Sequence, residues 1–179
     1  MIKRVILVGQ GASGKDYLKI RLQNKGLTPS VSYTTRPPRI GEENGVSYHF
    51  IDDEIFTSMI ARDEFREWNL FSEKKWYYGT SKKVFETAQL FVMTPSGIKA
   101  LSQKERDDSL VLFIDIPEEI RRERLIARKD ADDVERRLHT DRIDFKDFMN
   151  YDFSICVPDF DSDEIYRALI EQQILIPTR

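Results

Sequence analysis

A glycine-rich segment near the N-terminus contains the residues best suited to hold phosphate. Residues 9–16 read GQGASGKD, with Lys15 directly after the last of three glycines. Glycine permits positive φ, so successive backbone N–H groups can converge on an anion, and a helix that begins there adds partial positive charge. The Lys15 amine can then reach the terminal phosphates of a nucleotide. We predict a phosphate-binding loop made of Gly9, Gly11, Ala12, Ser13, Gly14, Lys15 and Asp16.

The last residue of this loop departs from the usual pattern, in which a Ser or Thr hydroxyl binds Mg²⁺. Asp16 stands at that position. Two roles are open for its carboxylate: a Mg²⁺ ligand, directly or through water, or a favourable charge at the start of the following helix. We favour the Mg²⁺ role, because a carboxylate near phosphates repels them unless a cation lies between.

A second candidate phosphate site follows within residues 31–50, VSYTTRPPRIGEENGVSYHF. Arg36 and Arg39 flank two prolines, which stiffen the backbone between them. Two guanidinium groups on a rigid segment can clamp a dianionic phosphate with charge-assisted hydrogen bonds. Neutral donors for the same phosphate oxygens are Ser32, Tyr48 and Tyr78.

The elements that must position these residues follow from the apolar pattern. Short apolar runs predict β-strands at residues 4–9, 31–34, 90–94, 110–116 and 153–157. Patterns typical of helices cover residues 14–25, 95–104, 117–128, 132–148 and 162–173. Continuous apolar runs are typical of parallel strands buried on both faces. We therefore predict a single α/β domain with a five-stranded parallel sheet and helices on both faces.

Two segments interrupt this alternation. Residues 34–80 are rich in aromatic residues and turn signals and predict an inserted lobe with its own small sheet. Residues 124–148, acidic and arginine-rich, predict a helical lid. The core is then expected at residues 1–33, 81–123 and 149–179.

The composition limits the class of protein and the cellular compartment. The 179 residues are 40% hydrophobic and carry a net charge of −3, which argues against a general nucleic-acid binder. No run is long enough to span a membrane or resembles a signal peptide. The one cysteine, Cys156, lies in an apolar run, so we expect a buried thiol and a reducing compartment. We expect a cytoplasmic protein that is a monomer or a weak homo-oligomer.

At this point the chain resembles the guanylate kinase family over most of its length. The segments TTRPPRIGEENGVSYHF (34–50), EFREW (64–68) and WYYGT (76–80) match the family's signature blocks and follow the phosphate loop at the expected distance. The resemblance implies a P-loop nucleoside monophosphate kinase fold, with a monophosphate-binding lobe and a lid. It also implies phosphoryl transfer from ATP to GMP, with Mg²⁺ as cofactor and small-molecule nucleotides as partners.

The same resemblance implies roles for individual residues. Monophosphate contacts fall on Ser32, Arg36, Arg39, Glu42, Tyr48, Glu67, Tyr78 and Thr80. Among them, Glu67 binds the guanine edge, Thr80 reads the guanine carbonyl side, and Glu42 supports the arginine clamp. Catalytic residues fall on Lys15, Arg39, Arg128 and Arg137. By their helical spacing, Arg121, Arg124 and Arg128 share one helix face, and of these we expect Arg121 and Arg124 to be structural.

The sequence departs from the family at one strand. In LFVMTPSG (90–97), Val92 and Thr94 stand where the family has two aspartates, one of which contacts the base. One hypothesis is that Asp16 takes over the lost negative charge near Mg²⁺. Two alternatives to a GMP kinase stay open: a kinase for another (deoxy)nucleoside monophosphate, and a non-catalytic binding module. The presence of Gly14, Lys15, Arg36 and Arg39 favours the enzyme.

Overall fold

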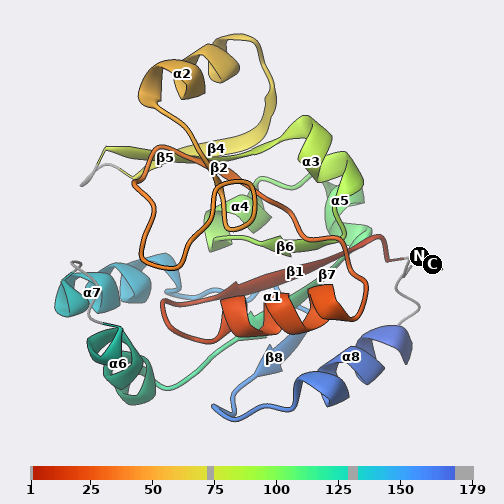
Figure 1. Cartoon of the computed structure of the whole chain (residues 1–179). Coiled ribbons are helices and arrows are strands. Elements are labelled where there is room, and N and C mark those ends of the chain that lie inside the picture. Colours follow the sequence, from red (N-terminus) through yellow and green to blue (C-terminus); the bar gives the residue numbers. More distant parts are fainter. Residues whose placement is uncertain (1, 72–74, 129–132, 172–179) are drawn as a thin grey trace. The chain divides into compact units, whose positions relative to one another are not determined.

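The structure, a computed structural model, describes residues 2–71, 75–128 and 133–171. Its contacts divide the chain into two compact units, residues 1–29 with 89–179 and residues 30–88 (Figure 1). Each unit contains a β-sheet of its own. Within the described ranges, no helix combines the length and apolar character needed to cross a membrane.

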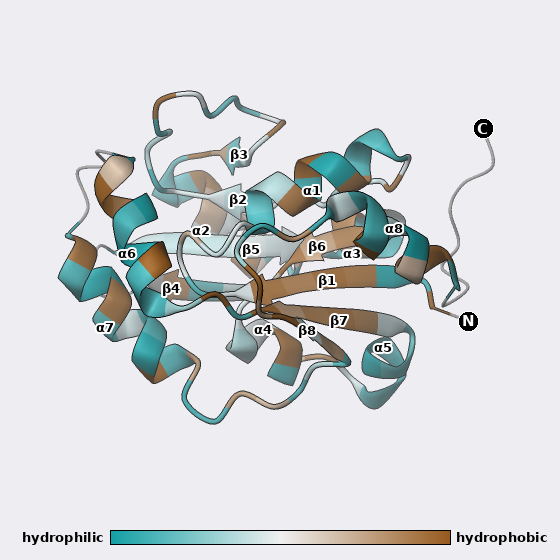
Figure 2. Ribbon diagram, turned by 90° about the horizontal axis from the view of Figure 1, so that it is seen from below, coloured by the Kyte–Doolittle hydropathy of each residue, from teal (hydrophilic) through white to brown (hydrophobic). Residues whose placement is uncertain are grey.

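The first unit is built on a parallel sheet with the strand order β6-β1-β7-β8. Its strands are β1 (Arg4–Gly9), β6 (Leu90–Val92), β7 (Ser109–Ile114) and β8 (Phe153–Ile155). Its helices are α1 (Lys15–Asn24), α4 (Pro95–Lys99), α5 (Gln103–Asp107), α6 (Glu118–Ala127), α7 (Val134–Asp144) and α8 (Ser162–Glu171). The centre of β1 is fully buried, as its apolar run predicts, and Figure 2 shows β1 and β7 as hydrophobic ribbons.

The prediction that residues 31–34 form a fifth strand of this sheet is wrong. Within residues 31–34, Tyr33 and Thr34 form β2 of the second unit instead. Next to β6 there remains an isolated parallel bridge between Pro29 and Leu90. Proline has no N–H to donate to a ladder, so regular pairing does not continue through it. The sheet formed by the described residues therefore has four strands.

The main core of this unit lies between β1 and two helices. Val5 and Leu7 project from β1 to the same side, because strand side chains alternate between faces. They pack in one buried cluster with Leu18 and Leu22 of α1 and Leu169 of α8. This packing holds the start of α1 directly after the end of β1, where the glycine-rich segment lies.

An aromatic cluster joins the chain after α7 to the sheet. The ring of Phe113, on β7, lies 5.7 Å from that of Phe145 and 5.4 Å from that of Phe148. Tyr151 completes the cluster, 5.3 Å from Phe113. The end of α7 is thus anchored to the same sheet that carries the phosphate loop.

Two local predictions in this unit are wrong. The helix expected over residues 95–104 is two short helices, because Ser102 starts α5 with a reciprocal capping box to Glu105. Cys156 is exposed rather than buried. It follows β8, the terminal strand in the observed order, where Phe153 is also exposed.

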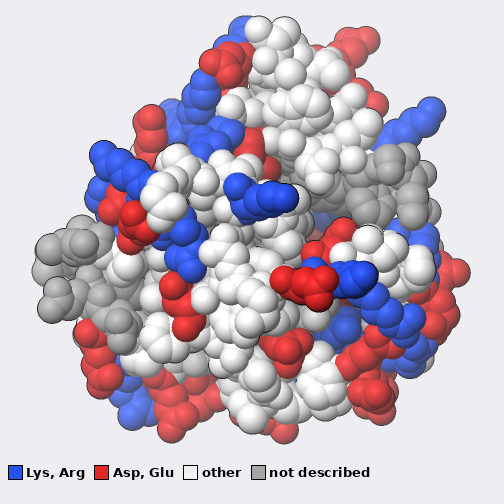
Figure 3. All heavy atoms as spheres, turned by 180° about the vertical axis from the view of Figure 1, so that it is seen from behind, with Lys and Arg blue, Asp and Glu red and all other residues white. Residues whose placement is uncertain are grey.

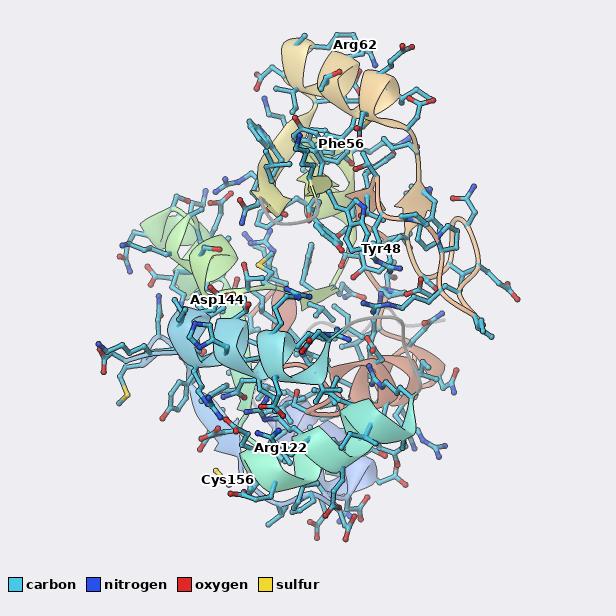
Figure 4. The ribbon with its side chains drawn as sticks, turned by 90° about the vertical axis from the view of Figure 1, so that its left-hand side faces the viewer. Tyr48, Phe56, Arg62, Arg122, Asp144 and Cys156 are labelled. Carbon is cyan, nitrogen blue, oxygen red and sulfur yellow. The ribbon has the colours of Figure 1, made fainter. Side chains whose placement is uncertain are left out.

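The second unit has a mixed sheet with the strand order β3-β2-β5-β4. Its elements are β2 (Tyr33–Thr34), β3 (His49–Phe50), α2 (Asp53–Ala61), β4 (Phe65–Phe71), β5 (Trp76–Ser81) and α3 (Lys82–Thr87). Phe56 projects from α2 toward the strands, as Figure 4 shows, and stacks on Phe65 and Tyr77 with ring centroids 4.4 and 5.0 Å away. The aromatic residues that set this region apart in the sequence therefore form its core.

The charged residues lie mainly outside these cores. The sequence has 28 basic and 31 acidic residues, and Figure 3 shows the two signs interspersed over one face. Because charges of opposite sign lie side by side, their electrostatic fields largely cancel at a distance from this face.

Candidate active site

The glycine-rich segment forms a tight loop between β1 and α1. Gly9 is packed so closely that a Cβ there would lie 2.6 Å from the carbonyl oxygen of Ile114. Gly14, which precedes α1, has φ +104°, and Ala12 has φ +60°. A non-glycine residue in this left-handed region costs on the order of 1 kcal/mol and is typical of functional loops. These turns orient the loop amides as an anion site requires.

Lys15 folds back over this loop. Its Nζ donates to the carbonyl oxygens of Gly9 and Gln10, each at 2.7 Å, and lies 3.5 Å from Ser13 Oγ. Burial lowers the pKa of the Lys15 amine to about 8, against the opposing effect of Asp16 and Asp141. Two carbonyl oxygens of the loop therefore hold the amine in this structure.

Both arginines predicted to be catalytic in the lid lie within reach of this lysine. The positive charges of Arg128 and Arg137 lower the Lys15 pKa further, as smaller contributions than burial. A Cβ on Gly11 would lie 4.0 Å from Arg137 Nε, which places that side chain beside the loop. Residues 129–132, in the middle of the predicted lid, lie outside the described residues.

A groove of about 630 Å³ adjoins the loop within the same unit. The residues that line it are Ala12, Gly14, Asp16, Tyr17, Arg124, Ala127, Arg128, Pro158, Asp159 and Phe160. The exposed carboxylate of Asp16 faces this groove, as do two arginines. Its lining is mixed, with apolar side chains, two arginines and two aspartates.

Sequence reasoning missed the part that Arg124 plays here. Its guanidinium donates to the carbonyl oxygen of Ala12 at 3.3 Å and to that of Pro158 at 3.2 Å. Arg124 thus fixes two sides of the groove relative to each other. The helical spacing of Arg121, Arg124 and Arg128 showed that they share a face but did not show which one reaches the loop.

Sequence reasoning also missed Asp141, on α7. Its Oδ2 accepts a hydrogen bond from the backbone N–H of Gly11 at 2.9 Å and one from Arg121 Nη1 at 2.8 Å. The Arg121 side chain is buried, and its Nε donates to the carbonyl oxygen of Ile116. These contacts join the loop, α6 and α7.

The second unit contains the predicted arginine clamp. Glu42 holds both arginines: its Oε1 accepts from Arg36 Nη2 at 2.8 Å, and its Oε2 accepts from the backbone N–H of Arg39 at 2.7 Å. Partial burial acts to raise the pKa of Glu42, but these bonds outweigh it and hold the pKa below its ordinary value. The Arg36 side chain is only 4% exposed and lies over the rings of Tyr48 and Phe50.

The remaining predicted monophosphate contacts gather on the same sheet. Tyr48 lies edge-on to Tyr78, with ring centroids 6.1 Å apart. Ser32 Oγ lies 3.2 Å from Thr80 Oγ1. Both tyrosine side chains and Ser32 are half-buried, and Thr80 is buried.

An irregularity in the pairing of β4 with β5 determines which residue lies opposite Glu67. A register shift between Phe65 and Glu67 places Glu67 opposite Thr80 of β5. Burial raises the pKa of the Glu67 carboxyl, while hydrogen bonds from Thr80 oppose that shift. The result is a half-buried carboxylate with the Thr80 hydroxyl beside it, a pair that can accept and donate at the edge of a base.

The strand end that carries Val92 and Thr94 has no carboxylate. Val92 packs against the main core of the first unit. The Thr94 hydroxyl caps α4, where it accepts from the Gly97 N–H at 3.2 Å and lies 2.8 Å from Ser96 Oγ. These positions therefore have structural contacts of their own.

A parallel α/β unit whose first strand leads through a glycine-rich loop and Lys15 into a helix defines the class of P-loop nucleotide-binding proteins. The chain belongs to the guanylate kinase family, whose model, described as guanylate kinase, matches residues 1–174.

Individual relatives agree with this assignment. The guanylate kinase of Campylobacter jejuni (strain RM1221) is 31% identical over 163 residues, covering 84% of this chain and 78% of its own. That of Mycoplasmopsis pulmonis is 32% identical and covers 94% of both chains. The crystal structure of guanylate kinase from Anaplasma phagocytophilum superposes with a TM-score of 0.70 at 24% identity, covering 97% of this chain and 88% of its own. That likeness confirms the fold.

Proposed function

We propose that this protein is a nucleoside monophosphate kinase that transfers the γ-phosphoryl group of ATP to GMP, giving ADP and GDP. One observation carries the proposal: Glu42 binds the buried guanidinium of Arg36 and the backbone N–H of Arg39, in a chain that also has a phosphate loop with its lysine in place. A module that only binds a partner needs neither the loop lysine nor a cationic clamp held by its own counter-ion.

Each charged group has a role in this reaction. Lys15 leaves the carbonyl oxygens of its own loop for the donor phosphates, and the loop amides bind the same phosphates. Arg36 and Arg39 hold the acceptor phosphate, which is already nucleophilic as a dianion and needs no general base. Arg128 and Arg137 neutralise charge on the phosphoryl group in flight. We assign residues 34–80 as the monophosphate-binding lobe and residues 124–148 as the lid.

The groove beside the loop is the proposed site for the rest of the donor nucleotide. It opens next to Gly14 and Asp16, so a triphosphate on the loop would extend its ribose and base into it. Arg124 and Phe160 offer a cation and a ring to an adenine, and the groove is large enough for a nucleoside. We therefore add Arg124 to the residues of the proposed donor-nucleotide site.

Mg²⁺ fits this arrangement as a partner of the nucleotide. Among the described residues, no three His, Cys, Asp or Glu side chains gather as a metal site. Asp16 supplies one exposed carboxylate oxygen at the groove, the ligand type that Mg²⁺ prefers, and phosphate oxygens and water would supply the others. The ion would neutralise phosphate charge, while Asp16 would anchor it.

Glu67 is the proposed reader of the base. Guanine presents N1–H and N2–H₂ as adjacent donors, which one carboxylate can accept together. Hydrogen bonds to a charged group contribute about 1.5–3 kcal/mol each, so Glu67→Gln should lower kcat/KM for GMP by about 100-fold or more. Because burial raises the Glu67 pKa, GMP binding should weaken on acidification at a higher pH than an ordinary glutamate would cause. Steady-state kinetics from pH 5 to 8 measure both effects.

A second candidate is a kinase for another nucleoside monophosphate. Val92 and Thr94 favour it, because both residues have structural contacts and neither offers a carboxylate to a base. Without that contact, discrimination rests on Glu67 and the hydroxyl groups of Ser32 and Thr80. A pyrimidine nucleotide or a deoxynucleotide would then lose fewer hydrogen bonds relative to GMP than it would in a site with that carboxylate.

One assay separates these functions. ATP-dependent phosphorylation is measured with GMP, dGMP, AMP, CMP, UMP and dTMP, with Lys15→Met as the control. We expect the highest kcat/KM with GMP and a loss of at least about 1,000-fold in the control. A different best acceptor would select the second candidate. Wild-type protein that phosphorylates none of the six acceptors would indicate a binding module.

A further inference from the structure

The contact between Asp141 and Gly11 places a carboxylate on an amide of the phosphate loop. The Gly11 N–H donates to Asp141 Oδ2 at 2.9 Å, although 130 residues separate the two in the chain. The approach depends on the missing side chain of Gly11, since a Cβ there would lie 3.3 Å from the same oxygen. All participants belong to the first unit.

A buried cation holds this carboxylate in place. Arg121 is 4% exposed, and its Nη1 donates to Asp141 Oδ2 at 2.8 Å. Its Nε is fixed by the Ile116 carbonyl oxygen at 3.0 Å, so the guanidinium cannot swing freely. The Asp141 side chain is itself 17% exposed, and charge-assisted bonds of this kind are strong where water is largely excluded.

The chemistry of the contact matches that of a bound phosphate. Amides of a phosphate loop are oriented to donate to anionic oxygens, and a carboxylate oxygen is such an acceptor. A phosphate oxygen cannot share the Gly11 N–H with Asp141 in the same geometry. Like charges this close together repel each other strongly where water is largely excluded, so a polyanion would expel the carboxylate.

We propose that Asp141 is an intramolecular competitor of the donor triphosphate, occupying the anion position at Gly11 until a nucleotide phosphate displaces it. The proposal rests on the proposed function in one respect, that this loop binds the donor phosphates. Displacement also takes the counter-ion from Arg121, whose positive charge then faces the incoming phosphate. Phosphate occupancy is thereby linked to α7, which carries both Asp141 and Arg137.

The test compares charge removal at two positions of one helix. Asp141→Asn and Asp141→Ala both remove the competing charge, and Asn preserves the side-chain shape. Asp144→Asn removes the same charge three residues further along α7, at an exposed position (Figure 4). Calorimetric titration with tripolyphosphate at fixed ionic strength measures polyphosphate affinity without involving a base, and the Lys15→Met variant described below shows how much of that affinity belongs to the loop.

We expect both Asp141 variants to bind tripolyphosphate about fivefold or more tightly than wild type, and Asp144→Asn to stay within about twofold of it. The nucleotide-free Asp141 variants should also melt at lower temperature. Unchanged or weaker binding by folded Asp141 variants would overturn the proposal, as would an equal gain in Asp144→Asn. In wild-type protein, the ¹³C resonance of the Asp141 carboxyl should shift on tripolyphosphate binding, and an unchanged resonance would also overturn it.

One control separates this proposal from the proposed function. Lys15→Met should bind tripolyphosphate much more weakly than wild type. Equal binding by these two proteins would show that the loop is not the phosphate site, and the proposed function would fail with it. Weak binding by Lys15→Met together with unchanged binding by the Asp141 variants would overturn the competitor alone.

Discussion

Removal of the Glu42 carboxylate should weaken both the fold and the acceptor site. Glu42 accepts two hydrogen bonds, from the Arg36 guanidinium and from the Arg39 backbone N–H. The Arg36 side chain is 4% exposed, so loss of its partner leaves a buried charge without compensation. Glu42→Ala removes both bonds, whereas Glu42→Gln keeps one neutral acceptor oxygen in place.

The size of the effect follows from these two bonds. A hydrogen bond to a charged group contributes about 1.5–3 kcal/mol, and the 20% exposure of Glu42 favours the lower end. We expect a loss of about 3 kcal/mol for Glu42→Ala and about half of that for Glu42→Gln. In a protein of this size, 1 kcal/mol lowers Tm by about 2–4 °C, so Glu42→Ala should melt about 6–12 °C lower.

Thermal unfolding and acceptor kinetics measure this prediction together. We expect kcat/KM for GMP to fall about 100-fold in Glu42→Ala and about tenfold in Glu42→Gln, with an unchanged KM for ATP. Glu43→Ala, the exposed neighbour, is the matched control and should leave both properties near wild type. Wild-type stability together with wild-type GMP kinetics in Glu42→Ala would refute the reasoning.

The stabilisation by Glu42 should also depend on pH. The folded pKa of Glu42 lies below its unfolded value, so its stabilisation is complete above an unfolded pKa of about 4.3. It is lost as pH falls through the lower folded value. The difference in unfolding free energy between wild type and Glu42→Gln should therefore be constant from pH 8 to 5 and shrink below about pH 4. A difference that keeps growing on acidification would contradict this assignment.

Two further predictions concern the phosphate loop. Because burial lowers the Lys15 pKa to about 8, affinity for ATP should fall as the pH of the titration rises through that value, whereas Lys15→Met should show no such dependence. Gly9→Ala should cost about 1–3 kcal/mol and weaken ATP binding, because its Cβ would lie 2.6 Å from the Ile114 carbonyl oxygen. Gly97→Ala, whose Cβ would meet nothing closer than 3.5 Å, is the control, and equal melting temperatures of the two variants would count against the packing argument.

Sequence patterns predicted the parts of the fold that depend on neighbouring residues. The run at residues 4–9 predicted the buried strand β1, and the glycines after it predicted the turn into α1. The fifth strand failed because Thr34 has a β-type pattern that suits either sheet, and pairing partners are not local. The break between α4 and α5 depends on Ser102, whose cap outweighed the apparent helical continuity.

In the site, Glu42 contacts both Arg36 and Arg39, and the phosphate clamp that the two arginines and the prolines between them suggested stays a prediction. The contacts of Arg124 and Asp141 were not accessible in the same way. Each joins segments more than 30 residues apart, and each residue belongs to a charged helix on which several neighbours have the same charge. Only the packing of α6 and α7 on the loop distinguishes them.

The exposed thiol of Cys156 provides a ready-made reporter. It is the sole cysteine of the sequence, and Pro158 and Phe160, which line the groove, follow within four residues. A maleimide fluorophore can therefore be attached at one position without any substitution. Its emission would respond to a nucleotide in the groove, so that donor binding could be followed in real time by stopped flow, separately from turnover.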